Sequence, residues 1–257
     1  MKERGGKEKG NGEGKKERVL PNIPFSTSVE GVLEKYGIKI LHQIDENSKE
    51  FKLCIDDILH RIENIGPVVD SNEAMRCEYI STVLHIAISI LRGLVILPQM
   101  TVSVEESSDH IDYAIKKILD DLLEKIICII EGKQNQLEKG MAQNLMQCRS
   151  SCKMNLDTLK KKRKAEEAFE EHEYVYGIVI TVMDWYFILH STEGIYCTSK
   201  TEYRISLTND IIKNPTKLRK NVKRTLEVIV GLLKDRVSAS DEPANKKHHV
   251  EEIIKKK

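Results

Sequence analysis

Residues 125–133 read KIICIIEGK, and this stretch decides how the rest of the chain is interpreted. The apolar run Ile126–Ile130 is too short for a membrane span and matches a strand that is buried on both faces. An acid and a lysine, Glu131 and Lys133, follow it directly. Because side chains at positions i and i+2 of a strand point to the same side of a sheet, we expect Glu131 and Lys133 to lie together.

Further strand-like and helix-like patterns surround this strand. Two β-rich segments, 94–104 and 110–118, precede it and predict a three-strand antiparallel meander. A helical pattern over 136–152 follows it, with its apolar residues on one side. We expect a strand pair at 174–190 and an amphipathic C-terminal helix over about 215–235.

Two helical patterns come before the strands. Apolar residues recur at spacings of three and four over 29–65, and Gly66-Pro67 ends this pattern. A second helix is predicted over 74–91, with its N-cap offered by Ser71-Asn72-Glu73. The order of helices, meander, helix, strands and helix predicts the α/β fold class.

Composition limits the class of protein. The chain has 257 residues, and its 41 Lys and Arg against 40 Asp and Glu give a formal net charge of +1. No apolar run reaches the roughly 18 residues that a transmembrane helix needs. The many Ile, Leu and Val residues in the middle of the chain exclude a wholly disordered protein. The near-zero net charge excludes a strongly basic, histone-like protein.

The ends of the chain differ in composition from its middle. Residues 1–18 are charged and rich in glycine, which predicts a disordered tail, and 238–257 are expected to form a flexible basic tail. Between them we expect an N-terminal helical segment, 19–68, and one domain, 69–237. No secretory signal is visible, and the six cysteines fit no metal pattern, so we expect an intracellular protein with buried thiols.

The residues that could carry chemistry are Asp112, Glu131 and Lys133, with Glu78 in the preceding helix. If the strands of Asp112 and Glu131 are neighbours, the two carboxylates form a pair of hard oxygen ligands that suits Mg²⁺. A metal ion lowers the pKa of a bound water, and Lys133 would hold that water or a phosphate. Glu78 would be a further ligand. The alternative is that these are ordinary strand-end charges, and that Glu131 and Lys133 form a surface ion pair.

These residues resemble, in their order, the motif of the PD-(D/E)xK nuclease superfamily, and Gln143 and Gln147 in GMAQNLMQ extend the likeness. Within the superfamily, the chain resembles the nuclease-like domains of expanded fungal families and of Crinkler-type proteins. The resemblance covers about residues 71–190. It implies a restriction-endonuclease-like core of helix, three antiparallel strands, helix and strand. Ile111, rather than proline, precedes the aspartate.

The resemblance implies a nuclease that uses Mg²⁺ or Mn²⁺ to hydrolyse phosphodiester bonds, with nucleic acid rather than a membrane as its partner. It assigns Asp112, Glu131 and Lys133 to catalysis, with the two acids at the metal. Gln143 and Gln147 would orient the substrate or water. Because some members keep the fold and have lost cleavage, the alternative is an inactive, effector-like module that binds nucleic acid or protein.

Two basic clusters bear on partners and location. The first is a run of five consecutive cations: Lys160, Lys161, Lys162, Arg163 and Lys164. This run is typical of a nuclear-import signal or a phosphate-contacting loop, and equally of a solvated loop. In the C-terminal helix, Lys217, Lys220 and Arg224 fall on one side, where they suit either phosphates or an acidic neighbour. A third possibility is a protein-interaction module built on the helices of 29–65.

Overall fold

The computed structural model of the chain gives the placement of most residues between 41 and 239. The described residues are 41–68, 72–104, 107–119, 123–133, 136–162, 174–181, 183–191, 194–197 and 203–239. The expected tail at 1–18 and nearly all of that at 238–257 lie outside these residues. Within them, no helix is both long enough and apolar enough to cross a membrane.

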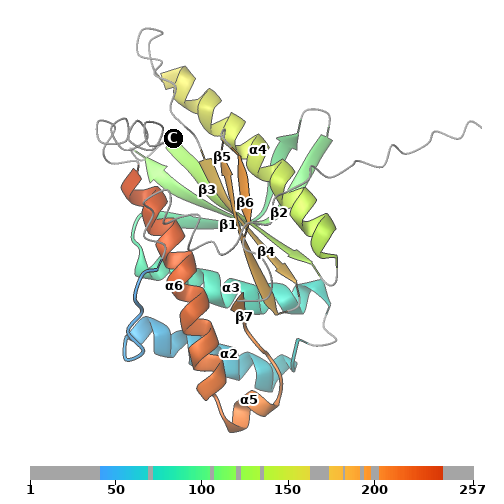
Figure 1. The fold of residues 1–257 in the computed structure, drawn as a ribbon, viewed down its shortest axis with the longest axis vertical. Helices are drawn as coiled ribbons and strands as arrows, with labels where there is room; N and C mark the ends of the chain where they lie inside the picture. The colour runs from blue at the N-terminus through green and yellow to red at the C-terminus, as the bar shows by residue number, and fades with distance from the viewer. Residues whose placement is uncertain are drawn as a thin grey trace, which may run out of the picture.

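The described strands form one seven-stranded mixed sheet (Figure 1). They are β1 (Leu94–Val104), β2 (Ser107–Leu119), β3 (Leu123–Lys133), β4 (Tyr174–Thr181), β5 (Asp184–Ser191), β6 (Ile195–Cys197) and β7 (Tyr203–Arg204). Strands β1 to β6 lie side by side in chain order, and β7 pairs with β5. The pairing of β3 with β4 is parallel and the other pairings are antiparallel. The predicted α/β class and the three-strand antiparallel meander are therefore confirmed.

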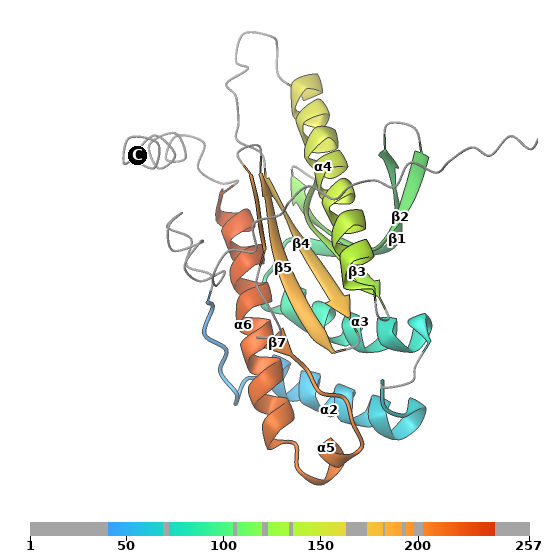
Figure 2. The same ribbon diagram turned by 45° about the vertical axis from the view of Figure 1, so that its right-hand side comes forward.

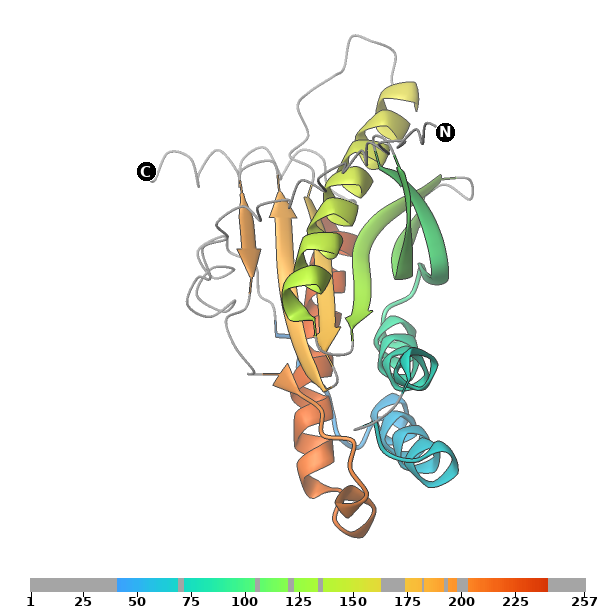
Figure 3. The same cartoon turned by 90° about the vertical axis from the view of Figure 1, so that its right-hand side faces the viewer.

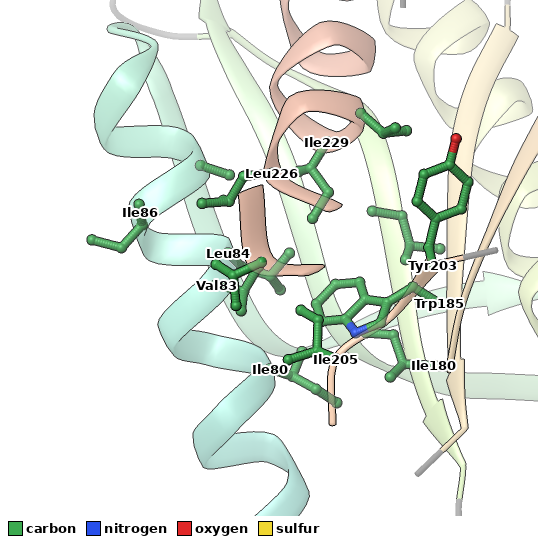
Figure 4. Packing of buried hydrophobic residues seen from close by; sticks show 14 of the residues in the cluster. Ile80, Val83, Leu84, Ile86, Ile180, Trp185, Tyr203, Ile205, Leu226 and Ile229 are labelled. Carbon is green, nitrogen blue, oxygen red and sulfur yellow. The ribbon is translucent and has the colours of Figure 1, made fainter. Parts of the chain in front are cut away.

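Helices cover both faces of the sheet (Figures 2 and 3). They are α2 (Lys49–Ile65), α3 (Glu73–Ile90), α4 (Leu137–Lys162), α5 (Asp210–Lys213) and α6 (Thr216–Ala239). The larger core lies on the side of α3 and α6, where Trp185 of β5 packs beside Ile80 and Ile205 (Figure 4). Helix α4 covers the opposite face with two smaller apolar clusters. All six cysteines are free thiols, and Cys128 is buried as expected.

The N-terminal helix begins later than its apolar spacing predicts. The hydroxyl of Ser48 accepts a hydrogen bond from the backbone N–H of Phe51, which caps α2 and fixes its start at Lys49. Residues 41–48 are not helical, so that part of the prediction is wrong. Instead, the backbone N–H of His42 donates to the carbonyl of Glu227 at 3.1 Å, so this segment runs along α6. Residues 29–40 lie outside the described residues.

A β-bulge and buried amides attach α4 to β3. Ile115 of β2 pairs with Cys128 while Lys116 pairs with Ile126, so Ile127 is an extra residue in β3. The bulge interrupts the ladder, and Asn155 of α4 satisfies both backbone groups of Ile126. It accepts from that N–H at 3.1 Å and donates to that carbonyl at 2.8 Å.

A second amide, Asn144, sits between α4 and two strands. Its side chain donates to the carbonyl of Ile129 in β3 at 3.1 Å. Its Oδ1 lies against Gly177 of β4, where an added Cβ would overlap that oxygen. Both asparagines are buried. They fix how α4 crosses the sheet from β3 to β4, and hence where its first turns lie.

Gly177→Ala tests this close approach. The added methyl group should force α4 away from β4 and lower the free energy of unfolding by about 1–3 kcal/mol. Urea denaturation of the wild type, Gly177→Ala, Asn144→Ala and the double variant would measure it. The double variant should recover part of the loss, because Asn144→Ala removes the atom that is overlapped. Strictly additive losses would contradict the predicted contact.

Candidate active site

The candidate site lies where β2 and β3 part. Their register ends at the pair Tyr113–Ile130. Beyond it, β2 continues beside β1, and β3 continues beside β4 from Glu131 to Lys133. The parting removes the ladder partners of several backbone groups in the middle of a sheet, and buried backbone groups must be satisfied in another way. The polar side chains of the site supply these hydrogen bonds.

Asp112 bridges the gap from the β2 side. Its Oδ2 accepts a hydrogen bond of 2.7 Å from the backbone N–H of Gly132, the residue between Glu131 and Lys133. The amide of Gln99 in β1 reaches its other oxygen at 3.5 Å. Gln99 has a φ of +52°, which is costly for a residue with a side chain and is typical of constrained positions in functional sites. Asp112 is 7% exposed, so this carboxylate is held by the protein rather than by solvent.

Glu131 and Lys133 face α4, as their spacing predicts. The ammonium of Lys133 lies 2.5 Å from Oε1 of Glu131. Gln147 of α4 donates to the other carboxylate oxygen at 3.2 Å and to the carbonyl of His110 in β2 at 3.3 Å. The single side chain of Gln147 thus spans the gap between the two strands. Glu131 is 1% exposed, so the interpretation as a solvated strand-end charge is wrong for this residue.

Two glycines leave room for this arrangement. A Cβ on Gly140 of α4 would lie 2.9 Å from Cγ of Lys133 and 3.0 Å from a methyl group of Val179. A Cβ on Gly132 would lie 3.1 Å from Ile80. All three distances are tighter than ordinary contacts. The absence of side chains at these positions therefore allows the lysine stem and α3 to approach β3.

Burial sets the protonation of the site. It raises the pKa of Glu131 to about 7, with the charge of Asp112 acting in the same direction and Lys133 acting against both. Burial also raises the pKa of Asp112, although the Gly132 N–H and Lys133 favour its ionised form. Burial would lower the pKa of Lys133, but the hydrogen bond and charge of Glu131 outweigh it and raise that pKa. When both acids are ionised and Lys133 is protonated, the three side chains therefore carry a net negative charge.

The remaining predicted residues are placed differently. The side chain of Glu78 is 57% exposed and pairs with Arg61 of α2 at 3.6 Å. The acid of α3 whose charge acts on both Asp112 and Lys133 is Glu73. Gln143 is half-buried on α4, one turn before the glutamine that reaches Glu131.

The basic clusters lie away from the gap. Lys160–Lys162 end α4, which corrects the interpretation of this part of the run as a loop, while Arg163 and Lys164 lie outside the described residues. The three predicted cations of α6, Lys217, Lys220 and Arg224, are exposed, and this helix covers the opposite face of the sheet. Two other cations of α6, Arg219 and Lys223, contact Glu46 and so hold the segment that precedes α2.

Sequence patterns missed several residues of the site. Gln99 and Glu73 have no distinctive spacing, and the strand-length apolar pattern hid the positive φ of Gln99. Asn144 and Asn155 are ordinary polar residues of a helical pattern until the bulge in β3 is known. A polar residue on the apolar side of an amphipathic helix was the available signal. No family model matches the chain, and no curated protein matches it either.

The buried acid predicts how stability depends on pH. Because folding raises the pKa of Glu131 to about 7, the folded state favours its protonated form. This contribution is fully present below about pH 4.5 and is lost as the pH rises through 7. In metal-free buffer, Glu131→Gln should therefore be more stable than the wild type at pH 8, by about 1–3 kcal/mol, and nearly equal at pH 4.

Urea unfolding at the two pH values measures this difference. Glu138→Gln, which changes an exposed acid in the first turn of α4, is the matched control and should show no such dependence. An equal stability difference between Glu131→Gln and the wild type at pH 4 and pH 8 would show that folding does not raise the pKa of Glu131.

Proposed function

We propose that the protein is a Mg²⁺-dependent nuclease that hydrolyses phosphodiester bonds. The observation that carries the proposal is the hydrogen bond from the Gly132 N–H to Asp112, which holds one buried acid against the Glu131-Gly132-Lys133 segment. Two acids and an amine thereby converge at one point of the sheet. This combination of a metal-binding acid pair and a lysine suits water attack on phosphorus.

The residues fit a divalent cation. The described residues hold no group of three or more His, Cys, Asp or Glu side chains placed to share a metal. Mg²⁺ does not need such a group, since it is commonly bound through one or two carboxylates, with water and substrate phosphate completing its shell. Asp112 and Glu131 would hold it, and their raised pKa values indicate a place where added positive charge is favourable.

Each side chain has a role in the proposed reaction. The metal ion, when bound, would stabilise the charge that develops on the phosphate. The ammonium of Lys133, 27% exposed, would orient the attacking water or a phosphate oxygen. Gln147 fixes the carboxylate of Glu131, and Gln99 fixes that of Asp112. The hydrogen bonds from these two side-chain amides keep both acids in place before a substrate binds.

The order of elements supports the same proposal. Helix α3, the meander β1–β2–β3, helix α4 and strand β4 follow one another in the order that the resemblance to PD-(D/E)xK nucleases implies. We propose on this basis that these elements form a restriction-endonuclease-like core. Asp112 lies on its second strand, the Glu131–Lys133 pair on its third, and Gln147 on the helix that follows.

A cleavage assay tests the proposal. The full chain should cleave labelled DNA or RNA oligonucleotides with Mg²⁺ or Mn²⁺ and should be inactive with a chelator. Lys133→Ala and Asp112→Asn should each lower the cleavage rate by about 10²–10³-fold, because each removes a charge from the reacting centre. Product formation resolved on denaturing gels gives the rate.

Two matched variants separate chemistry from folding. Lys139→Ala removes an exposed lysine from the first turn of α4, and Glu78→Gln removes the acid that pairs with Arg61. Both should cleave at the wild-type rate. The proposal is wrong if the folded wild type leaves DNA and RNA intact with either metal, or if Lys133→Ala cleaves as fast as the wild type.

The exposed cations of α6 support a second candidate function, an inactive fold that binds nucleic acid. Lys217, Lys220 and Arg224 are exposed, and no acid lies between Ile211 and Leu226 in the sequence. Exposed cations on one helix suit contacts to the phosphate backbone. In this case binding would depend on the surface of α6 and not on Glu131.

Salt-dependent binding tests the second candidate. Replacing Lys217, Lys220 and Arg224 together by alanine should reduce the slope of log affinity against log salt by about 2–3. A triple variant of Lys139, Arg149 and Lys153 removes the same charge from exposed positions of α4 and is the control. Fluorescence anisotropy with a labelled oligonucleotide gives the slope. Equal slopes for the two variants would count against α6 as the binding surface.

A further inference from the structure

A row of polar residues continues from the candidate site along one edge of the sheet. Lys133 of β3 is the register partner of Thr181 in β4, and Thr181 is the partner of Asp184 in β5. Asp184 is in turn the partner of Arg204 in β7. Four neighbouring strands thus each place one polar residue at the same level of the sheet. We call Lys133, Thr181, Asp184 and Arg204 the rim row.

The rim row lies on the face of the sheet that α4 covers. Val179 and Tyr186 belong to the apolar cluster beneath Met141 of α4. Thr181 and Asp184 are two residues along the strands from Val179 and Tyr186, so they share that face. Directly paired residues also share a face, which places Arg204 with Asp184. Lys133 and Glu131 face α4 as well, so the row and the candidate site form one continuous surface.

The last pair of the row is only loosely joined. Nε of Arg204 lies 3.8 Å from Oδ1 of Asp184, which is an ion-pair distance but beyond hydrogen-bond length. Among the residues that the structure describes, no donor reaches this buried oxygen within hydrogen-bond distance. The Arg204 side chain is 52% exposed. The guanidinium is therefore available to a ligand without breaking a hydrogen bond to Asp184.

We propose that Arg204 binds a backbone phosphate of a nucleic-acid strand that runs along the rim row toward Lys133. This inference rests on the proposed nuclease function and adds the direction in which the substrate lies. A guanidinium binds phosphate oxygens through two parallel N–H groups, and such contacts fix the register of a strand without reading its sequence. In the free protein the carboxylate of Asp184 is the counter-charge of this guanidinium, and a bound phosphate would compete with it.

The spacing of the strands gives the length of the substrate contact. Three strand spacings of about 4.8 Å separate Lys133 from Arg204, or about 14 Å in total. Phosphates of a B-form strand follow one another at about 3.4 Å along its axis. The contact at Arg204 therefore falls about four nucleotides from the bond at Lys133 if the strand keeps the B-form rise, and fewer if the strand is extended. An oligonucleotide too short to span this distance cannot reach both residues.

Binding as a function of substrate length tests the proposal. Unlabelled single strands of increasing length would compete with a labelled strand in Ca²⁺, with anisotropy as the readout. The wild type should gain about tenfold in affinity once the competitor is long enough to span the distance from Lys133 to Arg204. Arg204→Ala should lose this gain, and its salt slope should fall by about one. Arg204→Lys, which keeps the charge, should keep most of the salt slope.

Two further variants sharpen the result. Arg92→Ala removes an exposed arginine that lies just before β1, and its length dependence should match that of the wild type. Asp184→Asn should tighten binding, because its carboxylate competes with phosphate for the guanidinium, and should have no effect when combined with Arg204→Ala. Wild-type affinity, length dependence and salt slope in folded Arg204→Ala would overturn the proposal. Failure of the wild type to bind any strand would overturn it as well.

Cleavage measured on the same strands in Mg²⁺ separates this inference from the proposed function. If Arg204 governs binding but no strand is cut, the nuclease function fails and the rim contact stands. If cleavage depends on Lys133 while Arg204→Ala binds like the wild type at every length, the function stands and the rim contact fails.

Discussion

The hydrogen bond between the Gly132 N–H and Asp112 joins the two parts of the central sheet at the point where β2 and β3 separate. Beyond Tyr113 and Ile130 the ladder between β2 and β3 ends, yet both strands continue in opposite halves of the sheet. Without other partners, the freed backbone groups would be buried and unsatisfied. Asp112 satisfies one of them and Gln147 satisfies another, so the residues proposed for chemistry also hold the strands in place.

This double use has an energetic cost. Glu131 is almost wholly buried and lies within the field of a second acid, with a single lysine to balance the two charges. Such an arrangement destabilises the free protein at neutral pH and favours whatever brings positive charge. The buried asparagines of α4 offset part of the loss by fixing the helix to β3 and β4. The features of the site that favour added positive charge therefore lower the stability of the free protein, as is common at functional sites.

The apolar runs of the sequence predict the strands well, and the i, i+2 rule places Glu131 beside Lys133. Gln147 was indicated by the resemblance to the PD-(D/E)xK motif and not by any spacing within its helix. The contact of Glu78 could not be predicted, because Glu73 and Glu78 lie on the same helix and only the packing of α2 decides that Glu78 meets Arg61. Likewise the start of α2 depends on the hydroxyl of Ser48, which competes with an apolar spacing that continues through residues 41–48. Local hydrogen bonds and helix packing, rather than periodicity, decide these features.

The bulge at Ile127 has a consequence for how this sequence can change. Ile126 packs on the α4 face and Cys128 on the face of α3 and α6, so the extra residue exchanges the sides on which later residues of β3 lie. Glu131 and Lys133 reach α4 only because of this exchange in phase. Substitutions within the strand leave that phase intact, whereas loss of one residue would send both side chains to the other face. The number of residues in β3 is thus constrained more strictly than the identity of its apolar residues.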